Sequence, residues 1–188
     1  MEQFDARAFH SLGLPRVGQL GFVVHSIEAA LPSYSAVYNL DTWFTPNYAE
    51  MEFKVGGEPV AMDLDLKVAF SGNTQIELIE ATGPGAGIYQ RHLAEHGEGL
   101  QHLGFFVPSV PKRLAMAQQL GLEVLLEGGF TTKGGGRVQV VYLDTREFCG
   151  IIVELIEISL YGIHLPQTPF TLNLATITGD ATKTKIAK

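Results

Sequence analysis

The stretch QLGFVVHSI at residues 19–27 recurs later in the chain as HLGFFVPSV at residues 102–110. Leucine, glycine, phenylalanine, valine and serine coincide in register between the two copies. A second stretch, ELIE, occurs at residues 77–80 and again at residues 154–157. The offsets between copies are 83 and 77 residues (102 − 19 and 154 − 77), a difference of only six. Two matches in the same order at nearly the same offset indicate an internal duplication.

Each copy begins a module with the same order of expected elements. The apolar, β-branched and aromatic start of the copy predicts a strand. The serine that follows is a typical helix N-cap, so helices are expected at about residues 27–38 and 110–120. Three more strands are expected in each half, the last of which carries the ELIE stretch. The pattern predicts an α+β fold of two βαβββ modules in tandem, at about residues 15–85 and 98–160, that form a curved mixed sheet.

Two segments lie outside this repeated pattern. Residues 47–67 are longer than a plain hairpin, and we interpret them as a flap. Residues 161–188 form a threonine-rich C-terminal extension, which we interpret as an arm over the cleft or over a partner subunit. Glycines at Gly128 and at residues 134–136 predict turns. We expect residues 1–188 to form one domain.

Composition restricts the class of protein. The chain has 188 residues, of which 46% are hydrophobic and 18% charged, which is sufficient for a sizeable core. The net charge of −7 argues against nonspecific binding to nucleic acid or to an anionic membrane. A single cysteine, Cys149, excludes an internal disulfide and fits a reducing compartment. Neither a signal peptide nor a membrane-spanning run is recognisable, so we expect a cytoplasmic protein.

Polar side chains interrupt the predicted strands at matched places in the two modules. Gln19 and His102 begin the first strands, and Glu77 and Glu154 lie in the last strands. Because strand side chains alternate between faces, the apolar neighbours of these residues point to the opposite face, under the helices. All four polar side chains, His102 included, are then expected to line the open cleft formed by the curved sheet.

A lone glutamate or glutamine on a strand usually faces water, and that reading applies to each of these residues taken singly. The duplication makes Gln19 equivalent to His102, and Glu77 equivalent to Glu154. A pseudo-twofold axis would bring both pairs together in the cleft. One imidazole, one amide oxygen and two carboxylates form a plausible octahedral site for a divalent metal ion, with two positions left for water or substrate.

The sequence resembles the vicinal oxygen chelate superfamily, which includes glyoxalase I, methylmalonyl-CoA epimerase, extradiol dioxygenases and fosfomycin resistance proteins. The resemblance covers about residues 17–159. At residues 57–66 and 76–80 the sequence is most similar to the epimerase-like branch. The segments that carry it are residues 19–24, 75–80, 97–102 and 153–157.

The resemblance implies one divalent ion, among zinc, nickel, cobalt, manganese and magnesium, held by Gln19, Glu77, His102 and Glu154. This ligand set is similar to that of eukaryotic glyoxalase I. Epimerases usually have histidine at the first position and glutamine at the second, so the chain departs from them at two ligands. Dioxygenases require histidine where this chain has Gln19.

Binding of glutathione is not expected, because the residues that glyoxalase I uses for it differ here. The family places arginines where this chain has Val23 and Glu98, and an asparagine where it has Ala81. The resemblance therefore implies a metal-dependent isomerase, epimerase or lyase in which Glu77 or Glu154 moves a proton next to a carbonyl. The expected substrate is a small molecule, either an acyl-CoA thioester or an oxo compound. The alternative is a non-catalytic binding or resistance protein of the same fold. In either case we expect a homodimer.

Overall fold

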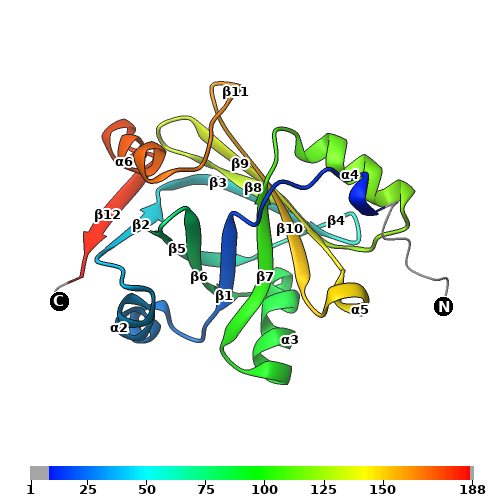
Figure 1. The fold of residues 1–188 in the computed structure, drawn as a ribbon, viewed down its shortest axis with the longest axis horizontal. Helices are drawn as coiled ribbons and strands as arrows, with labels where there is room; N and C mark the ends of the chain where they lie inside the picture. Colours follow the sequence, from blue (N-terminus) through cyan, green and yellow to red (C-terminus); the bar gives the residue numbers. More distant parts are fainter. Residues whose placement is uncertain (1–8, 187–188) are drawn as a thin grey trace.

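The computed structural model describes residues 9–186, and its centre is a single curled sheet of twelve strands (Figure 1). The strands are β1 (Gln19–Val23), β2 (Thr42–Pro46), β3 (Tyr48–Val55), β4 (Glu58–Val60), β5 (Asp63–Ser71), β6 (Thr74–Thr82), β7 (Gly99–Phe106), β8 (Val124–Thr132), β9 (Gly136–Leu143), β10 (Ile152–Leu160), β11 (Ile163–His164) and β12 (Ala181–Lys185). The helices are α2 (Ile27–Tyr38), α3 (Gly87–His96), α4 (Val110–Gln119), α5 (Arg146–Cys149) and α6 (Pro169–Thr178), with a 3₁₀ turn at Pro84–Ala86. No helix in the described range is long and apolar enough to cross a membrane.

The two predicted modules lie side by side in this sheet. Its strand order is β12-β2-β5-β6-β1-β7-β10-β9-β8-β3-β4, and β11 pairs with β10. Within module one β1 runs parallel to β6, and within module two β10 runs parallel to β7. The first strands of the modules, β1 and β7, pair antiparallel and join the halves. The predicted α+β class with a curved mixed sheet is confirmed.

The segment at residues 47–67 is part of the sheet, and its interpretation as a flap is wrong. β2 ends at Pro46 beside β5, whereas β3 begins at Tyr48 and pairs with β8. The chain therefore passes from one side of the curled sheet to the other within a few residues. This crossing places β3 and β4 beyond β8, the edge strand of module two, so that the backbone groups of β8 gain partners.

Gly128 is not a turn residue either, although the turn at residues 134–136 forms as predicted between β8 and β9. It lies inside β8 opposite Phe53 of β3, with φ of +152°. A Cβ at this position would collide with the backbone carbonyl of Glu52. Here glycine permits close approach of a neighbouring strand. In the sequence such a glycine cannot be told apart from one that marks a turn.

One helix in each module covers the outer face of the sheet (Figure 1). α2 packs on module one, and α4 packs on module two. The apolar side chains predicted to lie under the helices are buried there: Phe22, Val24, Ile76 and Leu78 in module one, and Phe105, Val107, Val153 and Leu155 in module two. Burial of each such side chain stabilises the fold by roughly 1.5–3 kcal/mol. This burial leaves the opposite face of the same strands for the polar residues.

The second glutamate of each ELIE stretch holds a helix in place. A carboxylate oxygen of Glu80 accepts from the backbone N–H of Ile27 at 2.9 Å, and that of Glu157 accepts from Val110 at 2.8 Å. These N–H groups belong to the first residues of α2 and α4 and have no partner within the helix. Ser26 and Ser109 cap the same helices, as predicted. Each repeated stretch therefore supplies one glutamate to the inner face and one to a helix cap.

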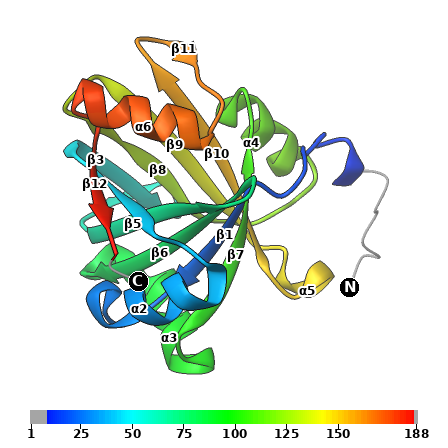
Figure 2. The same ribbon diagram turned by 60° about the vertical axis from the view of Figure 1, so that its left-hand side comes forward.

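The C-terminal extension lies across one end of the curled sheet (Figure 2). α6 buries Leu172 against Phe44 and Val68, and β12 pairs with β2. Between them, the carboxylate of Asp180 accepts hydrogen bonds from Thr132 and from the backbone N–H of residue 136. Of the two interpretations of this segment, the arm over the chain's own cleft is the one seen.

Candidate metal centre

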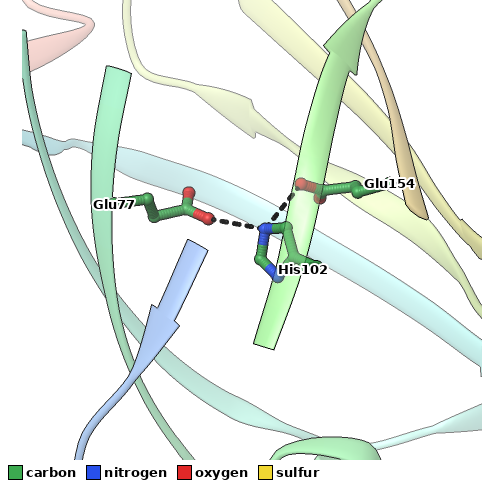
Figure 3. Close-up of side chains that lie close together, drawn as sticks. All are labelled: Glu77, His102 and Glu154. Atoms are coloured by element: carbon green, nitrogen blue, oxygen red, sulfur yellow. Dashed lines mark ion pairs between the residues drawn. The ribbon is translucent and has the colours of Figure 1, made fainter. Parts of the chain in front are cut away.

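The side chains of Glu77, His102 and Glu154 converge on the inner face of the sheet from β6, β7 and β10 (Figure 3). His102 Nε2 lies 3.0 Å from Glu154 Oε2 and 3.5 Å from Glu77 Oε2. The three potential ligand atoms lie within 4.8 Å of one another. Among residues 9–186, no other group of three histidine, cysteine or acidic side chains has that geometry. The structure thus brings together three of the four predicted ligands, and the side chain of the fourth, Gln19, lies within hydrogen-bond range of Glu77.

His102 does not line the open cleft, and that expectation is wrong. The residue is 0% exposed, and the walls of the inner cavity include Glu77 and Glu154 but not His102. The edge of the Tyr142 ring meets the imidazole at a centroid distance of 5.1 Å and an angle of 84°. The carboxylates therefore separate the imidazole from the cavity, a layering that strand alternation does not reveal.

Burial and mutual charge control protonation in this cluster. Burial raises the pKa of the Glu77 carboxyl, a shift opposed by the neighbouring His102 imidazole and strengthened by the charge of Glu154. Burial alone would lower the pKa of the His102 imidazole, but the charges of Glu154 and Glu77 outweigh it and raise the pKa to about 9. Without a metal ion, a protonated His102 is the cation that balances the carboxylates.

Several polar atoms around the cluster are buried and have no hydrogen-bond partner. They include Gln19 Oε1, His102 Nε2 and Glu154 Oε2. The last two lie within ion-pair distance but are not aligned as a hydrogen bond. Buried polar atoms of this kind call for an explanation. One nitrogen donor and hard oxygen donors suit a divalent ion, so the residues present fit the metal that the fold family implies.

Gln19 lies in β1, is 3% exposed and lines the same cavity as Glu77. Its Nε2 donates to Gln75 Oε1 at 2.8 Å, and its own oxygen is free of protein partners. Its role as the fourth ligand stays a prediction. Gln75 was missed by the sequence reasoning, although it precedes Glu77 by two residues and so shares its face of β6.

Glycines of the repeat make space for the site. A Cβ on Gly21 would collide with the imidazole ring of His102, and a Cβ on Gly104 would lie 2.8 Å from the Cβ of Gln19. Gly21 and Gly104 are equivalent in the duplication. Each module's glycine therefore accommodates the first polar residue of the other module, as a pseudo-twofold axis between β1 and β7 requires.

A β-bulge in β7 supplies a support for His102 that the sequence reasoning did not find. Gly21 pairs with His102 and Phe22 pairs with Leu100, so Gln101 is the extra residue in the ladder. Bulges re-aim side chains next to functional sites. Gln101 is 3% exposed, and its Oε1 lies 2.8 Å from His102 Nδ1. This contact orients the ring so that Nε2 faces the carboxylates.

The cluster lies at one end of a cavity of about 150 Å³. Its walls come from the inner face of the sheet and from α6, which contributes Leu172 and Ala175. Tyr89 of α3 and Tyr142 border it near the carboxylates, with their rings 6.0 Å apart and edge to face. A small molecule in the cavity would therefore have carboxylates at one end and apolar surface around the rest.

A curled sheet of two βαβββ modules, with a buried Glu–His–Glu cluster inside, defines a protein of the vicinal oxygen chelate class. Residues 18–142 match the family model described as the glyoxalase/bleomycin resistance protein/dioxygenase superfamily. The match covers more than half of the chain, which therefore belongs to that superfamily. A comparison of the chain with curated proteins found no match.

Solved structures with the same fold include epimerases. A variant of Streptomyces coelicolor methylmalonyl-CoA epimerase in complex with 2-nitronate-propionyl-CoA is 22% identical, with a TM-score of 0.52, over 81% of this chain and 99% of that chain. A methylmalonyl-CoA epimerase in complex with methylmalonyl-CoA and ammonium gives the same values. A hypothetical protein from Bacillus halodurans is 21% identical, with a TM-score of 0.50, over 75% and 92% of the respective chains. At these identities the likeness concerns the fold alone.

Proposed function

We propose that the protein is a metal-dependent isomerase, epimerase or lyase that moves a proton next to a carbonyl group. The observation that supports it is the pair of buried carboxylates, Glu77 and Glu154, which border a mostly apolar cavity and flank a shared imidazole. Structural carboxylates rarely remain buried without a hydrogen-bonded cation. A binding cluster with two bases beside a cavity suits acid–base chemistry on a small molecule.

In this proposal Glu77, His102, Glu154 and Gln19 hold one divalent ion, drawn from zinc, nickel, cobalt, manganese and magnesium. The ion would supply Lewis-acid stabilisation of negative charge on a carbonyl oxygen. Glu77 and Glu154 come from different modules and reach the cavity from two strands. Either carboxylate can take a proton from one side of the substrate carbon, and an epimerase requires a base on each side.

Glutathione remains an unsuitable substrate in this proposal. Val23 is fully buried in the apolar core, and Ala81 is buried in the same core cluster. The carboxylate of Glu98 accepts from the backbone N–H of His25 at 2.7 Å. None of the three positions offers a cation to a glutathione carboxylate. An acyl-CoA thioester or an oxo compound remains the proposed substrate class.

The test combines metal analysis with proton exchange. The purified protein should bind about one divalent ion per chain, and the loaded protein should incorporate solvent deuterium next to the carbonyl of its substrate. Candidate acyl-CoA thioesters and 2-oxo or 3-oxo compounds would be screened by mass spectrometry, with Glu77→Gln and Glu154→Gln as controls. Absence of metal after reconstitution would overturn the proposal. Binding without exchange would favour the alternative function, a non-catalytic binder, for which the apolar cavity is the supporting observation.

We also propose that the protein is a homodimer. The strand order ends at β12 and β4, and sheet edges usually pair or become covered. Light scattering at micromolar concentration should give twice the mass of the chain, and a monomeric mass would count decisively against the dimer. The cytoplasmic location and the division into one domain, with modules at residues 15–85 and 98–160 and an extension at 161–188, stay predictions.

A further inference from the structure

The cavity beside the carboxylates has two chemically different ends. Gln19, Gln75, Glu77 and Glu154 contribute its polar end. The remaining walls are mostly apolar and include Leu64, Leu66, Val68, Val140, Ile156 and Ile158. Such a cavity binds a molecule with an apolar body and a polar group at one end.

Unpartnered amide groups lie at the polar end. Gln19 Nε2 donates to Gln75 Oε1, while Gln75 Nε2 and Gln19 Oε1 have no hydrogen-bond partner. Exchanging the oxygen and nitrogen of both amides would still leave one N–H donor and one oxygen acceptor unused. Gln75 is 1% exposed, so water does not readily satisfy its amide. A ligand oxygen that accepts from Gln75 Nε2 would relieve the cost of this buried donor.

The charges around the cavity disfavour an anionic ligand. Among the described residues that line it, Arg137 is the one cation, and its side chain is exposed. Glu77 and Glu154 place acidic groups at the inner end, and Asp180 is occupied by Thr132 and the backbone of residue 136. In the metal-free protein the buried His102 imidazolium already balances Glu77 and Glu154, so a ligand carboxylate or phosphate inside would be desolvated beside two carboxylates and without a cation of its own.

The size of the cavity and the helix that lines it limit the ligand further. The volume of about 150 Å³ corresponds to a cavity that holds a benzene-sized molecule. Helix α6 contributes Leu172 and Ala175 to the wall opposite the carboxylates, and the hydrogen bonds of Asp180 hold the extension in place. This helix lies beyond residue 142, where the family match ends. We refer to α6 as the roof of the cavity.

We propose that the cavity takes a compact, uncharged, largely apolar carbonyl compound, with its oxygen on the Gln75 amide and its body against the apolar walls and α6. The inference rests on the proposed function only for the chemistry at the carbonyl; the binding itself requires no metal. It separates the two substrate classes left open above and selects the oxo compound over the acyl-CoA thioester. Gln75 is then a binding residue and Ala175 a specificity residue.

Binding to the metal-free full chain tests the proposal. Cyclohexanone, cyclohexanecarboxylate and propionyl-CoA would be titrated, and the methyl NMR signals of Leu64 and Val140 would be followed. The ketone should shift these signals, and the two anions should bind about tenfold more weakly or worse. Gln75→Met, which keeps the side-chain length but removes the donor, should weaken ketone binding by roughly fivefold. Equal or tighter binding of either anion would overturn the assigned ligand class.

Substitutions in α6 test the roof. Ala175→Phe fills the cavity and should abolish ketone binding, while Ile177→Phe, at a position 82% exposed and outside the cavity walls, should bind like the parent. Ala175→Leu is the smaller variant if the phenylalanine disturbs folding by circular dichroism. Unchanged binding in a folded Ala175 variant would refute the roof. A chain that binds the ketone but no metal would contradict the proposed function alone, and one that binds metal but not the ketone would contradict this inference alone.

Discussion

The two modules present the same backbone to the centre of the molecule but different side chains at matched positions. Gln19 of module one corresponds to His102 of module two, and Gly18 corresponds to Gln101. In module two the bulge turns Gln101 towards the imidazole, whereas in module one Gln19 contacts another amide, Gln75. The duplication therefore builds a symmetric cleft, and these two differences place a buried imidazole behind its carboxylates in module two and an amide in its wall in module one.

Several matched positions carry the same residue type in both modules. The glycines at 21 and 104, the cap glutamates Glu80 and Glu157, and the inner glutamates Glu77 and Glu154 all have the same role in both modules. The comparison indicates that the shared positions supply the fold and the pair of carboxylates, while the differing positions make the two halves of the site unlike each other. Substitutions at matched positions can test this division.

The largest effect on metal affinity is expected from substitutions of His102 and Gln19, the first polar residues of the two modules. His102→Gln makes module two resemble module one and should weaken metal binding by about a hundredfold or more, because the imidazole is the nitrogen donor of the cluster. Gln19→Met should weaken it by about tenfold, since a neutral oxygen contributes less. Metal titration by calorimetry measures both. Equal losses would mean that the modules contribute alike and that the assignment of His102 is wrong.

The same residue predicts a pH dependence in the metal-free protein. A histidine whose pKa is raised to about 9 in the fold stabilises it fully below the ordinary value of 6.5, and this stability is lost as the pH rises through 9. The raised pKa of Glu77 acts in the same direction above its ordinary value. Urea unfolding at pH 6.5, 8 and 9.5 should show a falling free energy of unfolding. His102→Gln should flatten the profile, and a parent profile that rises would contradict the charge balance described for the cluster.

Gln101 tests a feature that only module two has, because the matched position in module one is Gly18, which has no side chain. Gln101→Leu removes the acceptor on His102 Nδ1 and should weaken metal binding by about 10–100-fold, as is typical for a residue that orients a metal ligand. Gln90→Leu, in the exposed part of α3, is the matched control and should bind metal like the parent. Calorimetry with the two variants decides, and wild-type affinity in Gln101→Leu would show that the bulge does not support the ligand.

The glycine pair should show a graded effect on stability. Gly21→Ala forces a methyl group against the rigid imidazole ring and should destabilise the protein by about 1–3 kcal/mol. Gly104→Ala meets the longer and more adaptable Gln19 side chain, so a smaller loss is expected. Denaturant unfolding of the metal-free variants measures both. The reverse order would mean that the ring, and not the amide, can move aside.

The smallest effects are expected at the caps, and they should be equal. Glu80→Ala and Glu157→Ala each remove a carboxylate from a helix N–H at nearly the same distance. Each should cost about 1 kcal/mol, in the range measured for helix caps. Thermal unfolding followed by circular dichroism is sufficient. A marked inequality would show that one module depends more heavily on its helix than the duplication suggests.

The sequence by itself determined the two modules and the face of the sheet on which the polar residues lie. Repetition identifies equivalent positions, and alternation along a regular strand assigns them to a face, so Glu77, His102 and Glu154 could be grouped before their distances were known. Both kinds of reasoning use only local geometry and the comparison of one half with the other.

Only the tertiary structure decided the features that depend on contacts between distant segments. The bulge at Gln101 breaks the alternation, and the burial of His102 behind the carboxylates depends on how three strands curl together. The crossing from β2 to β3 and the roof formed by α6 arise because open strand edges and apolar surfaces gain partners far along the chain. Periodicity contains no information on which distant partner is chosen, since packing of the whole sheet sets that choice.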